Sequence, residues 1–481
     1  MSDSAADTSQ GSSSAGITRD APDQPRRVLS TLDATCVVIG AIIGTGIFLS
    51  PSSVAKLVDS NALVLLAWGL GGAIALCGAL VFAELGTRYN ASGAQYTILR
   101  DTCGPLPAFL FVFCNATGTQ AGAIGIIGTV CTRHLCIAAG GESLTGYPLI
   151  GVSALLIVIL AVANIVGVRW GSRIQNFTVY CKVLTLLAIT GIAVFASRSE
   201  IALAAAAEPA TRLSPWAGVL AALVPAFFAY GGWQQALWIS GEVRNPRRAI
   251  PRAIIIGMVL VVAIYLLANW AYLRLLGLEG VASSEAIASD AVATVYPDIG
   301  RRVIAAAVGL SAFGVLNSQL LSGPRLIFGM ARDGRFFEVF GKLSPRFGTP
   351  VAAICMLAGT AIALLLVAGR NGIVTILNGA VFIDCIFFVL TGAALIVLRK
   401  RDKAAVQAGD ASAFKNVAGK TFRIPLFPLI PILFILGEIG GLVGTYLDPA
   451  VRDATYVGAA WIVVGAILYA VRFNNKPPLH A

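Results

Sequence analysis

Twelve apolar stretches, each near the length of a membrane-crossing helix, constrain this chain more than any other feature of its sequence. A spanning helix needs about 20 mostly apolar residues. The candidates lie at 33–57, 61–86, 105–131, 148–167, 172–196, 215–240, 250–276, 301–330, 350–368, 373–398, 425–446 and 454–472. Charged residues make up only 12% of the chain, against about 25% in a soluble domain. We therefore predict an all-α membrane protein with twelve transmembrane helices and a lipid bilayer as its solvent.

The basic residues indicate how these spans are oriented. Most of the 35 Lys and Arg residues fall in alternate loops, with dense groups at 244–252 and 399–423. Cytoplasmic loops are enriched in Lys and Arg, so we predict a multi-pass protein of the cell membrane with both termini in the cytoplasm. The net charge of +11 then reflects membrane topology, and we expect no nucleic-acid partner.

Two spans carry glycines where an uninterrupted helix would avoid them. The first is VVIGAIIGTGIFLSP, residues 37–51, with Gly40, Gly44 and Gly46. The second is span six, where Gly231 and Gly232 follow Pro225. A glycine costs a helix about 1 kcal/mol relative to alanine. The pattern predicts a broken helix in each span, although Gly40 and Gly44 also fit a GxxxG helix-packing face.

The two breaks lie five spans apart, so their spans run in opposite directions across the membrane. Two antiparallel halves that each open with a broken helix are typical of inverted-repeat transporters. We therefore expect a five-plus-five inverted repeat with two extra C-terminal helices. The predicted units are a disordered cytoplasmic tail at 1–29, repeat halves at 30–198 and 199–398, a cytoplasmic loop at 399–424, and the last two helices with the tail at 425–481.

The breaks also indicate a kind of ligand. Backbone groups do not stay unpaired in lipid, so a break is tolerated only where it faces protein or a polar cavity. One half-helix offers N–H donors at its positive end, and the other offers carbonyls at its negative end. Donors suit a carboxylate and carbonyls suit an ammonium group, so an amino-acid zwitterion would satisfy both.

Several stretches in order along the chain resemble one family. They are IGAIIGTGIFLSP in span one, FAELGTRYNASGAQY after span two, NFTVYCKVLTLLAI in span five, FAYGGW and EVRNPRRAIPRAI in span six, and NSQLLSGPRLIFGMARDG in span eight. Together they resemble the amino acid–polyamine–organocation superfamily, and within it the L-type amino-acid transporter branch. The resemblance implies a secondary transporter that works by alternating access, with sodium-independent uptake or exchange of neutral L-amino acids.

The resemblance also assigns substrate contacts. They fall on Ile42, Thr45, Gly46 and Ile47 in span one, and on Phe228, Ala229 and Gly231 in span six. In the family, the aromatic residue that matches Phe228 closes over the substrate as a gate. The other interpretation of Phe228 is a core or lipid-facing ring.

Lys182 is the one basic residue deep in a span. A charge at mid-membrane costs at least about 2.5–3.5 kcal/mol, so Lys182 should face the bundle interior and bond to carbonyls or a carboxylate. In sodium-independent members of the family, a lysine at this place occupies the space of a sodium ion, which implies that no sodium is required here. The alternative is a lysine that snorkels to the interface.

Besides Asp33 at the start of span one, three acids lie in predicted spans. Asp384 in span ten has no counterpart in the family pattern; it either recognises a cationic side chain or pairs with another core group. A cationic amino-acid or polyamine carrier is therefore the alternative function. Glu84 lies near the inner end of span two, where it can pair with arginines, and Glu438 in span eleven lies outside the expected core.

Other classes of protein fit less well. The two histidines, His134 and His480, lie outside the spans, and no HExxH motif is present, so we expect neither an enzyme, nor a metal, nor a cofactor. A membrane amino-acid sensor on a transporter scaffold stays open, although no segment is long enough for a signalling domain. Animal members join a single-span glycoprotein through a cysteine after span three; Cys131 and Cys136 lie near that loop, but we expect no such partner.

Overall fold

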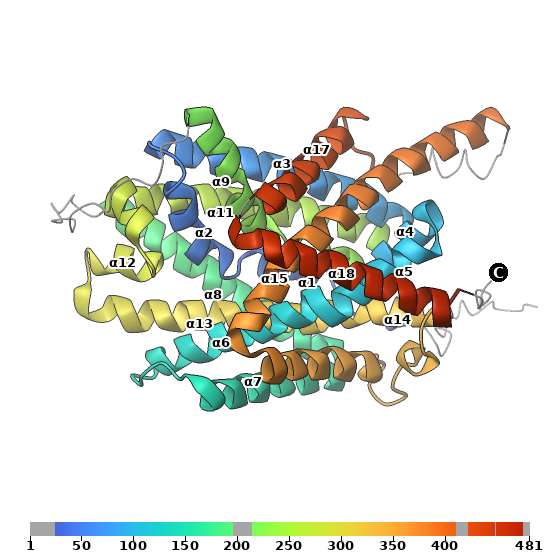
Figure 1. Ribbon diagram of the computed structural model, residues 1–481, viewed down its shortest axis with the longest axis horizontal. Helices are drawn as coiled ribbons and strands as arrows, with labels where there is room; N and C mark the ends of the chain where they lie inside the picture. The colour runs from blue at the N-terminus through green and yellow to red at the C-terminus, as the bar shows by residue number, and fades with distance from the viewer. Residues whose placement is uncertain (1–24, 196–213, 410–421, 448, 475–481) are drawn as a thin grey trace, which may run out of the picture.

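The computed structural model describes residues 25–195, 214–409, 422–447 and 449–474, without the side chains of 228, 297–301, 368–378, 447 and 449–451. Within these residues all extended regular structure is helical, and one isolated bridge joins Leu29 to Val243. Most of the helices run lengthwise through the molecule (Figure 1). The all-α class is confirmed, while most of the predicted tail at 1–29 and the boundary between the repeat halves at 198–199 lie outside the described residues.

The first part of the chain forms a bundle of helices broken at several points. Its elements are α1 (Thr31–Ile42), α2 (Gly46–Ala55), α3 (Asn61–Arg88), α4 (Ala94–Cys103), α5 (Pro105–Cys114), the π-helix η1 (Asn115–Thr119), α6 (Gln120–Ala138), α7 (Gly146–Val166) and α8 (Val168–Phe195). α1 begins where Ser30 and Asp33 form a reciprocal capping box, which satisfies backbone donors at the start of the helix.

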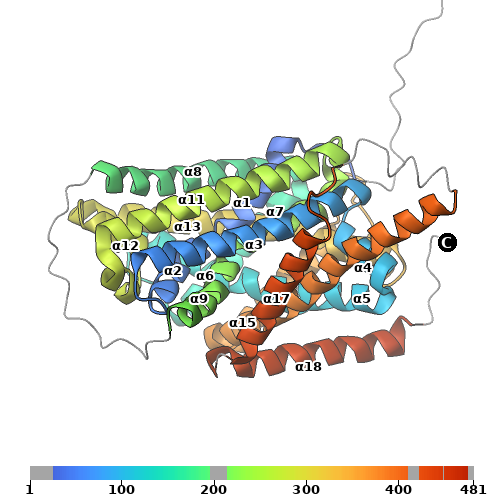
Figure 2. The same cartoon turned by 90° about the horizontal axis from the view of Figure 1, so that it is seen from above.

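The second part continues the bundle. Its elements are α9 (Pro215–Tyr230), α10 (Gln235–Trp238), the 3-10 turn η2 (Ser240–Glu242), α11 (Pro246–Ser283), α12 (Ile287–Ala293), α13 (Pro297–Ser322), α14 (Pro324–Arg332), the 3-10 turn η3 (Glu338–Gly341), α15 (Val351–Gln407), α17 (Leu429–Leu447) and α18 (Pro449–Arg472). The last two helices lie toward the outside: α17 packs on α15 and α3, and α18 packs on α15 and α5 (Figure 2).

Among the described residues, nine helical segments are long and apolar enough to cross a membrane, or ten if the bent pair α1 and α2 counts as one span. Two further predicted spans correspond to the shorter apolar helices Pro215–Phe227 and Val351–Val367. The protein is therefore a multi-pass membrane protein, and the number of twelve spans stays a prediction.

α15 differs from the prediction. The sequence indicates two spans with a connection at 369–372 and a cytoplasmic loop from 399, whereas the backbone is helical from Val351 to Gln407. Figure 1 shows that this run changes direction, with its first part beside α7. Near its end, Arg399 and Asp402 form ion pairs with Glu84 and Arg88 of α3. Loop residues 410–421 lie outside the described part.

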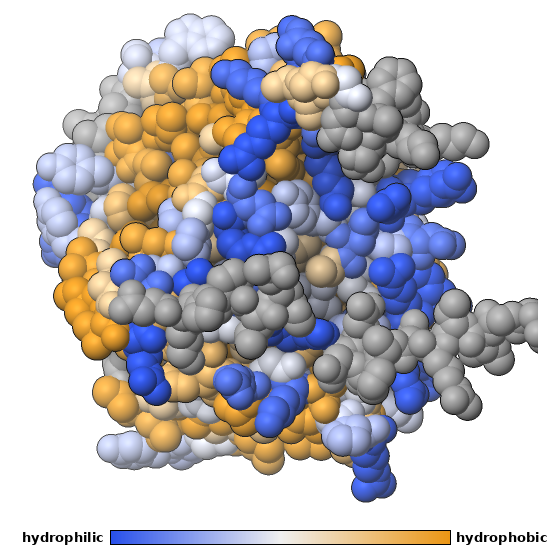
Figure 3. All heavy atoms as spheres, turned by 90° about the vertical axis from the view of Figure 1, so that its right-hand side faces the viewer, coloured by the Kyte–Doolittle hydropathy of each residue, from blue (hydrophilic) through white to orange (hydrophobic). Residues whose placement is uncertain are grey.

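The surface matches a bilayer environment. Large apolar side chains are exposed on several helices, among them Leu184, Leu220 and Leu436. The end of the molecule formed by α4 and α14, called here the α4 end, carries many hydrophilic side chains, with apolar ones around them (Figure 3). Apolar flanks and a polar end are what a membrane-crossing bundle presents to lipid and to water.

Buried ion pairs hold the α4 end together. Arg325 of α14 forms a two-pronged pair with Glu242, and the two side chains are 0% and 1% exposed. The carbonyl of Glu242 also accepts the N–H groups of Val28 and Leu29, both at 2.9 Å. Glu84 pairs with arginines, as expected: with Arg399 of α15 and with Arg88, which lies four residues further along α3.

A second polar cluster at this end joins α4 to the residue after α14. The Tyr96 hydroxyl donates to the Asp333 carboxylate at 2.7 Å, and Arg100 pairs with the same carboxylate. Burial, and then the neighbouring carboxylate, raise the pKa of Tyr96 above its ordinary value. The hydroxyl therefore stays protonated and keeps donating over the whole physiological pH range.

Replacing Arg325 tests how much this end contributes to stability. Arg325→Ala leaves the Glu242 carboxylate buried without its partner, a change that typically costs about 3–5 kcal/mol. We expect a clear drop in the melting temperature of the purified protein in detergent. Arg325→Lys, which keeps the charge but not the two-pronged geometry, should give a smaller drop; equal melting temperatures for all three proteins would contradict this assignment.

Candidate functional site at the two helix breaks

The first break separates α1 from α2. The chain leaves helical geometry at Ile43, Gly44 and Thr45, and the axes of the two helices differ by 42°. Thr45 precedes α2 and makes no capping hydrogen bond with its side chain. The first N–H groups of a helix have no partner within it. The Phe48 N–H donates to the Thr45 carbonyl at 3.1 Å, so the start of α2 presents the donors of Gly46 and Ile47 and a partial positive charge.

The second break follows α9. Helix α9 ends at Tyr230, Gly231 and Gly232 are non-helical, and the chain resumes in the short helix α10. Gly232 has a φ of 129°, a conformation that residues with a side chain rarely adopt. Its N–H donates to the side-chain oxygen of Gln234 at 3.1 Å.

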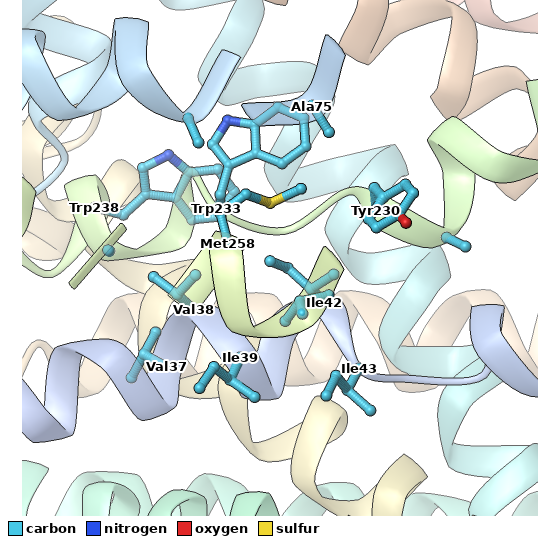
Figure 4. Packing of buried hydrophobic residues seen from close by; sticks show 14 of the residues in the cluster. Val37, Val38, Ile39, Ile42, Ile43, Ala75, Tyr230, Trp233, Trp238 and Met258 are labelled. Carbon is cyan, nitrogen blue, oxygen red and sulfur yellow. The ribbon is translucent and has the colours of Figure 1, made fainter. Parts of the chain in front are cut away.

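The two breaks lie against each other. A Cβ atom on Gly46 would lie 2.8 Å from the Cα of Ala229, and one on Gly232 would lie 2.8 Å from the carbonyl carbon of Ala41. Figure 4 shows the irregular chain between Tyr230 and Trp233 passing close to the end of α1 at Ile42. Glycine is required at both positions because the backbones approach too closely for any side chain.

Three side chains from other helices bind the carbonyls freed at the end of α1. Lys182 of α8 is 1% exposed, and its Nζ donates to the carbonyls of Gly40 at 3.1 Å and Ile43 at 2.6 Å. Ser311 of α13 donates to Ile43 as well, at 3.3 Å. The Tyr265 hydroxyl of α11 lies 2.9 Å from the carbonyl oxygen of Ile42 and 3.2 Å from that of Ala229.

Tyr265 therefore contacts both breaks at once, whereas Lys182 binds carbonyls of the first break. The Lys182 ammonium reaches a third carbonyl, that of Ser311, at 3.4 Å. No carboxylate among the described residues lies within ion-pairing distance of Lys182. Its charge is balanced by carbonyl dipoles, much as a bound metal cation would be.

A cavity of about 220 Å³ opens beside the breaks. Main-chain segments of both breaks line it, together with side chains of α3, α6, α13, α15 and α17. Its walls are largely apolar, and its polar lining residues are Thr45, Thr119, Gln120, Gln234, Gln235, Gln319, Asp384, Cys385 and Glu438. Such a cavity, mostly apolar with a few polar groups, is typical of a small-molecule site.

The structure brings most of the residues suggested by the sequence to this cavity. Those that line it are Ile42, Thr45, Gly46, Ala229, Gly231 and Asp384. Ile47 is buried but is not part of the lining, and Lys182 lies behind the first break. The side chain of Phe228, the expected gate, lies outside the described residues.

Two features of the cavity escaped the sequence analysis. Span three contains the π-helix η1, and its last residue, Thr119, lines the cavity with Gln120; π-helical turns inside α-helices occur frequently at functional sites. Glu438, which the sequence placed outside the core, also lines the cavity. That expectation was wrong because α17 packs on both α15 and α3, which brings its polar residue inward.

Glutamines attach the second break to α13. The side-chain oxygen of Gln235 accepts the hydroxyls of Ser318 at 2.9 Å and Ser322 at 2.7 Å, and its nitrogen donates to Gln319 at 2.7 Å. The two glutamines after the FAYGGW stretch thus have separate tasks: Gln234 binds the break itself, and Gln235 binds the neighbouring helix.

The fold and the cavity define a membrane carrier built around two interrupted helices. The chain belongs to the amino acid permease family, whose model matches residues 29–471. It is 31% identical to the serine/threonine exchanger SteT of Bacillus subtilis over 417 residues, 86% of this chain and 90% of that protein. The predicted resemblance is therefore confirmed.

Animal transporters are similar as well. The chain is 31% identical to the human b(0,+)-type amino acid transporter 1 over 388 residues, 78% of this chain and 76% of that protein. It is 29% identical to the human large neutral amino acids transporter small subunit 2 over 477 residues, 94% and 82% of the two chains. Cys131, one of the two cysteines near the loop after span three, is buried.

Tyr265→Phe tests the link between the breaks. The change removes the hydroxyl that contacts the carbonyls of Ile42 and Ala229, so we expect a loss of about 1–3 kcal/mol of stability, read as a lower melting temperature. Tyr272→Phe is the matched control, because Tyr272 is equally buried and its hydroxyl has no partner. An equal effect of both changes would argue against a special role for Tyr265.

Gly46→Ala tests the close approach of the breaks. The added methyl group would lie 2.8 Å from the Cα of Ala229, so the breaks must separate, and we expect transport to fall by about tenfold or more, as for misplacement of a binding site by about 1 Å. Gly69→Ala in α3 meets no atom within 4 Å and should transport normally. Equal flux in both variants would show that the spacing of the breaks is unimportant.

Proposed function

We propose that this protein exchanges amino acids across the cell membrane by alternating access and without sodium, with both termini in the cytoplasm. It acts as a carrier and not as an enzyme. The observation that carries the proposal is the juxtaposition of the two breaks, where the uncapped start of α2 faces the same cavity as the end of α9. The α-carboxylate of the substrate binds the N–H groups of the first turn of α2, and the α-ammonium binds main-chain carbonyls.

Lys182 supports independence from sodium. A sodium ion at this place would need several oxygen ligands, and the Lys182 ammonium already holds the carbonyl oxygens of Gly40, Ile43 and Ser311. An ammonium group held on the protein can supply the charge that a transported ion would otherwise bring. In this proposal Lys182 stabilises the broken geometry of α1 in every step of the cycle.

Binding of the α-carboxylate and the α-ammonium by main-chain atoms does not distinguish one amino-acid substrate from another by its side chain. The resemblance to L-type transporters favours neutral L-amino acids, and the relatives include a serine/threonine exchanger and a large neutral amino acids transporter. Asp384 at the cavity favours the alternative, a carrier of cationic amino acids or polyamines. A sensor on this scaffold would bind amino acids without moving them.

Flux into liposomes tests exchange. Purified protein is reconstituted in vesicles loaded with or without unlabelled amino acid, and uptake of a labelled one is measured at two pH values, in sodium and in choline buffer. We expect internal amino acid to accelerate uptake severalfold and choline to leave it unchanged. Uptake that needs sodium would contradict the proposed role of Lys182, and binding without any flux would favour the sensor.

Lys182→Ala tests the cation directly. The change removes the Lys182 donor from the Gly40 carbonyl and leaves the Ile43 carbonyl with only the longer hydrogen bond from Ser311, so we expect exchange to fall by at least about tenfold. Lys56→Ala, at an exposed position, is the control for loss of a lysine as such. Full exchange by a folded Lys182→Ala protein, still without sodium, would contradict the proposal.

A further inference from the structure

Two carboxyl groups from helices far apart in the sequence line the same cavity. Asp384 belongs to α15 and Glu438 to α17, and the Cys385 thiol beside Asp384 contacts the Glu438 carboxyl group. Among the residues that the structure describes, no Lys, Arg or His lies within ion-pairing distance of either acid. Buried acids in a membrane are usually paired, so this pair lacks a cation.

Unpaired oxygens from a third helix line the same cavity. Thr119 and Gln120 lie where η1 meets α6, and they are only 7% and 5% exposed. Neither the Thr119 hydroxyl nor the Gln120 side-chain oxygen has a hydrogen-bond partner. A buried oxygen without a donor is costly, so these two residues point independently to a ligand that carries N–H or O–H groups.

The number of acceptors indicates the kind of ligand. A proton held between the two carboxyl groups would pair those oxygens only and would leave Thr119 and Gln120 without a donor. An ammonium group carries three donors and a guanidinium group carries five, so one cation can serve several of these oxygens and also neutralise the acids. The observations therefore favour an organic cation over a proton.

The remaining lining fits an aliphatic stem. Ala123 and Ile127 lie on the same face of α6 as Gln120, three and seven residues further on, and Val381 precedes Asp384 by three residues on α15. Residues three or four apart share one face of a helix. Apolar walls, which include the Phe388 ring, thus lie beside the acidic groups.

We infer that Asp384, Glu438, Thr119 and Gln120 form a side-chain subsite for the cationic end of a basic L-amino acid, such as lysine, ornithine or arginine. The inference rests on the proposed function, because it takes the α-groups of the same substrate to be bound at the helix breaks. Neutral amino acids would occupy the breaks without filling this acidic end. The subsite makes Asp384 and Glu438 residues that determine specificity.

Competition on the unmodified protein gives the first test. Uptake of labelled L-alanine into proteoliposomes is inhibited with L-lysine and with L-norleucine, which has a similar chain but no side-chain ammonium. We expect lysine to compete at least about tenfold better, because a hydrogen bond to a charged group contributes about 1.5–3 kcal/mol. Equal or better competition by norleucine would overturn the inference while leaving the exchange of neutral amino acids intact.

Variants locate the subsite. Asp384→Asn and Glu438→Gln should each lower the ratio of L-lysine to L-alanine uptake by about tenfold, whereas Glu142→Gln, at an exposed position, should not change it. Unchanged ratios in folded variants would overturn the inference. The inference would also be overturned if alanine uptake by the unmodified protein depended on a proton gradient and Asp384→Asn removed that dependence. Absence of any flux, with lysine or alanine, would instead contradict the proposed function itself.

Discussion

The structure depends on the need to pair every backbone group that a helix break leaves free inside a membrane. The end of α1 meets this need with side chains from three other helices: Lys182 from α8, Tyr265 from α11 and Ser311 from α13. The break is therefore a fixed part of the bundle and not a frayed end. Its geometry is maintained by packing that reaches across most of the protein.

This arrangement leaves different groups free on the two sides of the break. The carbonyls at the end of α1 are largely occupied by protein donors, while the start of α2 has no cap and faces the cavity. In our account the main chain recognises the groups that all amino acids share, and side chains around the cavity select among them. Since Tyr265 contacts both breaks, a movement of either one disturbs the other.

Much of this arrangement could be predicted because short stretches of the sequence determine it. Glycines in apolar runs predicted both breaks, and Lys182 stood out as a lone charge deep in a span. Glu438 was misplaced because its position depends on how α17 packs on α15 and α3, which no local pattern encodes. The run NATGTQ at 115–120 was an available signal for the π-helix, since six small or polar residues interrupt an apolar span. The helical run through 369–372 likewise depends on tertiary context.

The most direct measurement compares three ligands: the amino acid that the protein exchanges fastest, its N-acetyl derivative and its methyl ester. Thermal stabilisation of the purified protein reports binding, because a ligand that binds only the folded state raises the melting temperature. If the breaks hold the ammonium and the carboxylate with main-chain atoms, the free amino acid stabilises the protein and neither derivative does. Equal stabilisation by either derivative would contradict the account.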